Sequence, residues 1–310
     1  MLRILLSIAP IFLLIVLGYG LRRRVFTSVE FWATADRMVY WLLFPALLFF
    51  KTSTIDLSGA LVRNFAVVIY CAFGAAVLFA LIAARFTSLD QPAATSVLQG
   101  AARHNTFIAL GAAERLYGSE GLALAALVAA LQIPITNITV VTLMVTMLSG
   151  RGRKDVVWAV LRDLVRNPLL IGVVLGLGVN VLGIAPIPVI HDLAGVLGDA
   201  ALPIMLLCVG ANIRVRAMGA APAATVLSMV GKMAVFPSTV FFVGQLTGLA
   251  GLPLQVALLF GAVPTAASAY TLARQLGGDA PLMASIITLQ TAAAFLTLPL
   301  TVALTNSLLG

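Results

Sequence analysis

The sequence predicts an all-α polytopic membrane protein: ten transmembrane helices in two inverted five-helix repeats, with broken helices four and nine crossing at mid-membrane. Its 310 residues are 61% apolar and only 10% charged, with a mean hydropathy of +1.10, far outside the range of soluble domains. The motif P-x5-V-L-G-x-G starts at Pro10 and again at Pro168, 158 residues later. Five predicted spans separate the copies, and an odd number inverts the second copy, as in inverted-repeat transporters. Close helix packing is the predicted role of the motif glycines, Gly18, Gly20, Gly176 and Gly178.

Ten apolar segments approach the ~20 residues that a helix needs to cross a bilayer core. They are 2–21, 34–51, 62–84, 92–117, 120–148, 167–184, 188–212, 221–247, 252–276 and 280–307. The first is predicted to stay in the mature chain, because a basic run, Arg22 to Arg24, follows it in place of a small-residue cleavage site. The predicted units are a first five-helix repeat, a cytoplasmic linker with an amphipathic helix, and an inverted second repeat, at 1–148, 149–166 and 167–310.

Basic residues predict the orientation in the membrane. One set of alternate loops holds twelve Lys and Arg residues, and the other set holds four. The positive-inside rule therefore puts the linker in the cytoplasm and both termini outside. We predict a multi-pass inner-membrane protein whose net charge of +8 reflects topology, with no nucleic acid as partner.

The fourth span carries four consecutive polar residues, Arg103, His104, Asn105 and Thr106, in its middle. An arginine at the centre of a lipid-facing helix costs ~2.5–3.5 kcal/mol on insertion scales, so this segment must face protein, water or substrate. Asn105 and Thr106 are good caps for a new half-helix after a break. The ninth span has Pro264 at the equivalent place, and proline breaks or kinks a helix there.

Two helices broken at mid-membrane would bring two half-helix N-termini together. Each N-terminus carries roughly half a positive charge from its unpaired N–H groups. With Arg103 beside them, the site suits an anion, most simply a carboxylate. The predicted substrate-binding residues are Arg103, His104, Asn105, Thr106, Asn137, Pro264, Thr265, Ser268 and Gln290.

Several of these assignments keep two interpretations open. Arg103 either coordinates substrate or is a structural cation satisfied by backbone carbonyls. Asn137 and Gln290 either line the cavity or form ordinary hydrogen bonds between helices. Three residues are candidates for ion coupling, each with a structural alternative: His104, Asp199 and Lys232. For Lys232 the alternatives are pairing with a carboxylate, binding the anion, or reaching towards the membrane surface.

Two pairs of charged residues near span ends are interpreted as features of the membrane interface. Asp36 and Arg37 are expected to pair with each other at the cytoplasmic start of the second span. His191 and Asp192 are expected to be solvated near the outer end of the seventh span.

The motifs of intramembrane enzymes do not occur in this sequence. It contains no H-E-x-x-H and no G-x-S-x-G, and it offers no pair of aspartates in a catalytic frame. We therefore predict a protein that is not an enzyme, with no catalytic residue, no metal ligand and no cofactor, while coupling to Na⁺ or H⁺ stays open. The alternative to a transporter is an anion-sensing receptor or a channel on the same fold. A channel would show rings of like residues along a pore, whereas the polar groups here gather at one depth.

The ordered motifs along the chain resemble the auxin efflux carrier family, which includes the plant PIN-FORMED auxin exporters and bacterial permeases for organic acids. The likeness covers nearly the whole chain. It rests on Gly18-Tyr19-Gly20-Leu21-Arg22-Arg23, Pro45-Ala46-Leu47-Leu48-Phe49, Gly100-Ala101-Ala102-Arg103-His104-Asn105-Thr106, Asn167-Pro168-Leu169, Leu197-Gly198-Asp199-Ala200-Ala201-Leu202-Pro203, Pro264-Thr265-Ala266 and Leu298-Pro299.

The resemblance implies a fold like that of the bile acid sodium symporters. Spans one, two, six and seven would form a scaffold, expected to be a homodimer, and the remaining spans a transport domain that moves by an elevator-type mechanism. It places substrate at the crossing, which carries over to Arg103, Asn105, Thr106, Pro264 and Thr265. The implied substrates are small mono- or dicarboxylates such as malate or malonate, or auxin-like aromatic acids. The short linker favours the bacterial organic-acid permease type.

Overall fold

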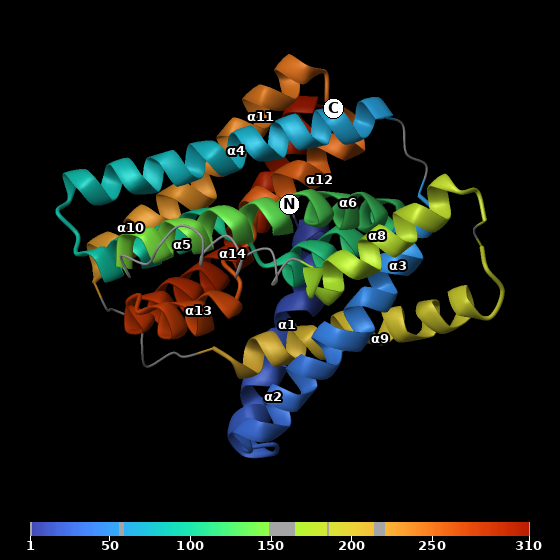
Figure 1. Ribbon diagram of the computed structural model, residues 1–310, viewed down its shortest axis with the longest axis horizontal. Coiled ribbons are helices and arrows are strands. Elements are labelled where there is room, and N and C mark those ends of the chain that lie inside the picture. The colour runs from blue at the N-terminus through green and yellow to red at the C-terminus, as the bar shows by residue number, and fades with distance from the viewer. Residues whose placement is uncertain (1, 56–58, 149–164, 185, 214–220, 310) are drawn as a thin grey trace.

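The structure is a computed structural model that describes residues 2–55, 59–148, 165–184, 186–213 and 221–309. Within these ranges every regular element is a helix (Figure 1). The helices are α1 (Leu2–Arg24), α2 (Val29–Met38), α3 (Phe44–Ser53), α4 (Gly59–Phe86), α5 (Gln91–Ala102), α6 (Thr106–Leu148), α8 (Pro168–Val181), α9 (Ile190–Ala211), α10 (Pro222–Val230), α11 (Phe236–Thr247), α12 (Gly251–Ala262), α13 (Ser268–Leu276) and α14 (Ala280–Leu309). The amphipathic helix predicted in the linker lies outside the described residues.

Seven helical stretches in the described part of the chain are long and apolar enough to cross a membrane. Two more apolar helices, α8 and α12, are shorter than a full span. One of the seven, Gln91–Leu148, is 58 residues long and would extend for about 87 Å as a straight helix, roughly three times the bilayer core. It is interrupted at residues 103–105 and again at Gly118, whose φ of 67° and ψ of −155° are not helical. Such a φ favours glycine, so the chain changes direction where the sequence provides one.

Two helical stretches that contain a proline are kept continuous by π-helical turns. The turn Val39–Leu43 joins α2 to α3 just before Pro45, and the turn Gly231–Val235 joins α10 to α11 just before Pro237. A proline inside a helix removes one N–H and crowds the carbonyl four residues earlier. A wider π turn accommodates the missing N–H and the crowded carbonyl without ending the helical stretch.

Two pairs of helices, α1 with α9 and α8 with α3, pack through the same type of contact, in which a glycine of one helix lies against a backbone carbonyl of the other. A Cβ atom added to Gly18 of α1 would overlap the carbonyl of Leu207 in α9. A Cβ on Gly176 of α8 would lie 2.7 Å from the carbonyl oxygen of Phe49 in α3. Gly176 follows Gly18 by 158 residues, and Leu207 follows Phe49 by the same number. The first glycine of each motif copy therefore packs closely as predicted, in the same register in both halves.

The second glycine of each copy does not share this role. No atom lies within 4 Å of a Cβ built on Gly20 or on Gly178, so the prediction of close packing is wrong for these two residues. They lie two residues beyond the packed glycines, which turns them about 200° around the helix and away from the interface.

His191 joins α9 to the end of α3 instead of being solvated as the sequence suggested. Its side chain is buried, with Nε2 2.9 Å from the hydroxyl of Ser53 at the end of α3 and Nδ1 accepting from the N–H of Ile187. Asn180 of α8 donates to the carbonyls of Ser53 and Ile55, at 3.0 and 2.8 Å. Asp192, one residue along, is exposed as expected.

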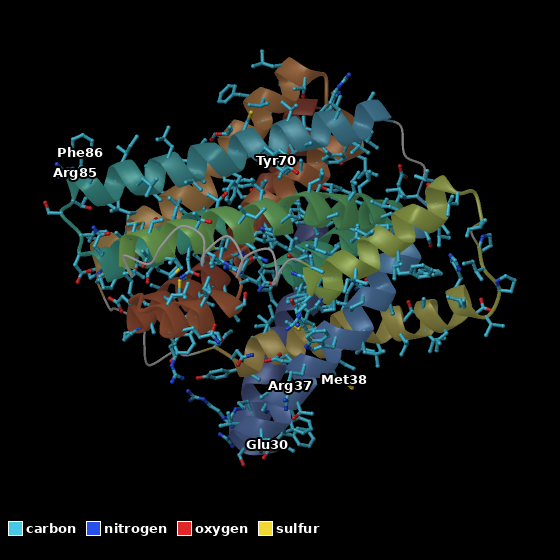
Figure 2. All side chains as sticks on the ribbon, viewed as in Figure 1. Glu30, Arg37, Met38, Tyr70, Arg85 and Phe86 are labelled. Carbon is cyan, nitrogen blue, oxygen red and sulfur yellow. The ribbon has the colours of Figure 1, made fainter. Side chains whose placement is uncertain are left out.

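The helices gather on two sides of the molecule (Figure 1). On one side α1, α2, α3, α8 and α9 pack against one another; on the other α4 packs against α5 and α11, and α12 against α11 and α14. Helix α6 contacts both sides. Figure 2 shows Arg85 and Phe86 at the left-hand tip of α4, and Glu30 and Arg37 on α2 at the bottom of the view.

Replacing Gly18 by alanine should loosen the α1–α9 contact, because the new methyl overlaps a backbone carbonyl that cannot move without shifting α9. We expect a loss of about 1–3 kcal/mol in unfolding free energy, measured as a lower melting temperature of the purified protein in detergent. Gly20→Ala is the matched control and should melt like the unmodified protein. Equal melting of both variants would mean that α1 and α9 do not pack through Gly18.

Candidate functional site

A cavity of about 730 Å³ lies between the two sides of the molecule. One wall comes from α2 and α9, with Asp36, Met205 and Asn212 among its residues. The other wall comes from α6, α13 and α14, and residues 103–106 also line it. Arg37 and Arg274 contribute two further cations. The polar run at residues 103–106, which the sequence singled out, therefore lines this cavity.

The break between α5 and α6 follows from its residues. Helix α5 ends at Ala102, and Arg103 adopts an extended conformation with φ −77° and ψ 150°. Asn105 restarts the helix: its Oδ1 accepts from the N–H groups of Phe107 and Ile108, both at 3.1 Å. The predicted capping of the second half-helix by Asn105 is confirmed, and α6 begins at Thr106 beside the cavity.

The break between α12 and α13 has nearly the same backbone geometry. Helix α12 ends at Ala262, and Val263 has φ −78° and ψ 152°. Val263 follows Arg103 by 160 residues, close to the 158-residue spacing of the glycine motif. The predicted interruption at Val263 and Pro264 is confirmed. The breaks touch directly, because the N–H of Asn105 donates to the carbonyl of Pro264 at 2.7 Å.

A buried network of side chains holds these breaks in place. The N–H of Thr265 donates to Oε1 of Gln290 at 2.8 Å, and its hydroxyl donates to the carbonyl of Gly100 at 2.8 Å. Nε2 of Gln290 also donates to Gly100 and to the hydroxyl of Ser228, both at 3.0 Å. Gly100 itself must be a glycine, since a Cβ there would overlap Ser228. Thr265 and Gln290 are fully buried.

The cavity lining includes six of the nine predicted substrate residues, namely Arg103, His104, Asn105, Thr106, Asn137 and Ser268. Pro264, Thr265 and Gln290 are not part of it. Their hydrogen bonds hold the backbone at the two breaks instead. Arg103 and Asn137, which lie 34 residues apart in sequence, meet through a 3.1 Å hydrogen bond from the guanidinium to the amide oxygen.

His104 differs from its neighbours in its bonding. It is 5% exposed and its ring centroid lies 5.4 Å from that of Phe260. Neither ring nitrogen has a hydrogen-bond partner among the described residues. A buried polar group in that state calls for a partner from outside the chain, such as water or a ligand.

Asp199 and Lys232, the other candidates for ion coupling, lie away from the cavity lining. Asp199 is exposed on α9. Lys232 is fully buried, which excludes the interpretation that it reaches towards the membrane surface. Its ammonium donates to the carbonyl of Phe260 at 3.2 Å and lies 4.7 Å from the ring centroid of Phe236.

The sequence did not predict the residues of α2 and α9 that form the cavity wall opposite Arg103. The predicted partner of Asp36 is Arg37, yet Oδ2 of Asp36 accepts from Asn212, the residue after α9, at 3.0 Å, and Arg37 donates to Thr34 at 3.3 Å. Asn212 carried no signal in the sequence beyond its place at the end of an apolar helix. Only the packing of α2 against α9 brings it to the cavity.

Comparison with known proteins gives one family and one named relative. A family described as "Membrane transport protein" matches residues 3–302. The chain is 26% identical over 306 residues to a protein of Methanothermobacter thermautotrophicus named "Uncharacterized transporter". The alignment covers 95% of this chain and 96% of that relative.

Gln290→Leu should destabilise the protein, because it leaves the buried N–H of Thr265 without its acceptor. A loss of about 1–3 kcal/mol is expected, read from thermal unfolding in detergent. Gln275→Leu applies the same change to an exposed glutamine of α13 and should leave the melting temperature unchanged. If the two variants melt alike, the network does not support the breaks.

Proposed function

The chain belongs to the membrane transport protein family, and from that premise we propose that it is a secondary transporter of small organic anions. The predicted membership among the auxin efflux carriers is thereby confirmed. The observation that carries the proposal is the Arg103–Asn137 pair, set in the cavity beside the first turn of α6. A guanidinium beside the positive end of a helix dipole is a receptor for a carboxylate.

The substrate class follows from charge and size. The cavity is lined by three arginines and, at its wall, by one aspartate whose Oδ2 already accepts from Asn212. Its volume lies in the range of sites for small molecules. Small mono- or dicarboxylates, such as malate or malonate, and auxin-like aromatic acids satisfy both conditions. His104 supplies a second polar contact for the bound acid.

The proposed mechanism is alternating access of the elevator type. In this proposal α1, α2, α3, α8 and α9 form a scaffold, which dimerises, and the helices from α4 to α6 and from α10 to α14 form the moving domain. The cavity between α2–α9 and α6–α13 supports this division, since it lies along the proposed boundary.

Ten spans in two inverted repeats are part of the same proposal. Helix α6 is divided at Gly118 between spans four and five, and α12 and α13 together form span nine. The 158-residue register of the glycine contacts and the matching dihedral angles of Arg103 and Val263 support it. Arg37 and Arg274, on the side with most basic residues, line the cavity, so we assign the structure to an inward-facing state in the inner membrane with both termini outside.

Purified protein in liposomes should take up a labelled carboxylic acid with saturable kinetics. Arg103→Gln should weaken the apparent affinity about 10–100-fold, because it removes a charge-assisted hydrogen bond. Arg85→Gln, at the tip of α4, is the control and should transport normally. Binding without uptake would favour a receptor, and a flux that does not saturate would favour a channel. If no acid of a broad panel binds or moves, the proposed function is wrong.

A cross-link across the cavity should stop transport if its walls move past each other. Cysteines at Met205 and Thr271, which line opposite walls, are introduced after Cys71 and Cys208 are replaced by alanine. Oxidation should abolish uptake, and reduction should restore it. A cross-link from Thr271 to Thr288, within the proposed moving domain, should leave uptake intact. Uninhibited uptake through the cross-wall variant would argue against an elevator.

A further inference from the structure

Lys232 lies in an unusual environment for a lysine. It belongs to the π-helical turn between α10 and α11 and is fully buried. Burying an ammonium ion costs several kcal/mol unless other groups compensate its charge. The contacts that the described residues give it are the carbonyl of Phe260 and the ring of Phe236, and neither is a carboxylate.

The carbonyl of Phe260 is a specific kind of acceptor. Phe260 lies two residues before the end of α12, so its carbonyl is among the last four, which have no partner within the helix. These carbonyls form the negative end of the helix dipole. The ammonium of Lys232 is therefore held by the C-terminal end of a helix that stops inside the protein, with a ring face on another side.

The π turn brings Lys232 to this position. Gly231, its neighbour, lies so close to α5 that an added Cβ would be 2.7 Å from the Cβ of Ala101. One turn of chain thus contacts both broken helices near their ends: Gly231 touches α5, and Lys232 touches α12. A longer or bulkier residue at position 231 would push the ammonium away from the α12 terminus.

In transporters with broken helices, unwound carbonyls and half-helix C-termini are the groups that coordinate a coupling cation. We propose that the ammonium of Lys232 is a permanent substitute for such a cation, so that anion transport needs no sodium or other metal ion at this break. The inference rests on the proposed function for the transported anion, but the occupied cation position can be tested without any substrate.

The substrate-independent test uses thermal unfolding of Lys232→Ala in detergent. The change removes the charge and leaves space at the α12 terminus, so a small cation should bind there. We expect methylammonium chloride, compared with choline chloride at equal ionic strength, to raise the melting temperature of the variant by roughly 2–4 °C and to leave the unmodified protein unchanged. Sodium chloride is tested in the same way. No cation-specific shift in the variant would overturn the proposal.

The transport test compares cations and two matched lysine variants. Uptake of the acid by the unmodified protein should be equal in sodium, potassium and choline buffers, and a requirement for sodium would overturn the proposal. Lys232→Met, which keeps length but not charge, should lose at least tenfold in uptake. Lys51→Met removes a lysine that also lies over a phenylalanine ring, at 5.2 Å from that of Phe50, and should transport normally.

Two results keep this inference separate from the proposed function. If the unmodified protein moves no acid but Lys232→Ala is stabilised by methylammonium, the substituted cation stands and the transport proposal fails. If Lys232→Ala cannot be purified in folded form, Lys232→Met and the sodium dependence of the unmodified protein decide. Full uptake by folded Lys232→Met would overturn the inference.

Discussion

A polypeptide that leaves the helix inside a membrane must satisfy its own backbone polar groups, because lipid offers no hydrogen bonds. The rest of this structure depends on that constraint at two places, residues 103–105 and 263–267. The N–H of Asn105 uses the carbonyl of Pro264, the N–H of Thr265 uses Gln290, and the carbonyl of Gly100 accepts from two side chains. The ammonium of Lys232 likewise donates to the carbonyl of Phe260 at the end of α12. Asn105 and Thr265 are buried, so other parts of the chain cover the two breaks.

The same constraint shapes the site that we propose for an anion. Each break exposes a positive helix start towards the cavity and a negative helix end away from it, where Lys232 neutralises one of them. Arg103 and His104 line the cavity beside the start of α6, and the guanidinium of Arg103 donates to Asn137. In the proposed transporter, Arg103 and His104 would therefore face the anion, and the ammonium of Lys232 would lie behind the break, at the end of α12.

The parts of the fold that follow from local chemistry could be predicted. A run of four polar residues in an apolar span, a capping asparagine and a proline at the equivalent place were enough to locate both breaks. The long-range pairings could not be found this way. Nothing local indicates that Thr265 bonds to Gln290, that Asn212 bonds to Asp36, or that His191 is buried against Ser53, because each partner lies far away in sequence. Gly20 and Gly178 show the limit of motif reasoning, since a shared pattern contained only one packed glycine per copy.

The reciprocal glycine contacts have a consequence for biosynthesis. Helix α1 packs against α9, and α3 packs against α8, so these partners of the first helices lie in the second half of the chain, although α6 also contacts α1 and α3. While the ribosome is still translating the first 150 or so residues, at about 5–20 residues per second, the grooves at Gly18 and Phe49 can be covered only by lipid or by an insertion factor. The α1–α9 and α3–α8 contacts can therefore form only after α8 and α9 have been synthesised.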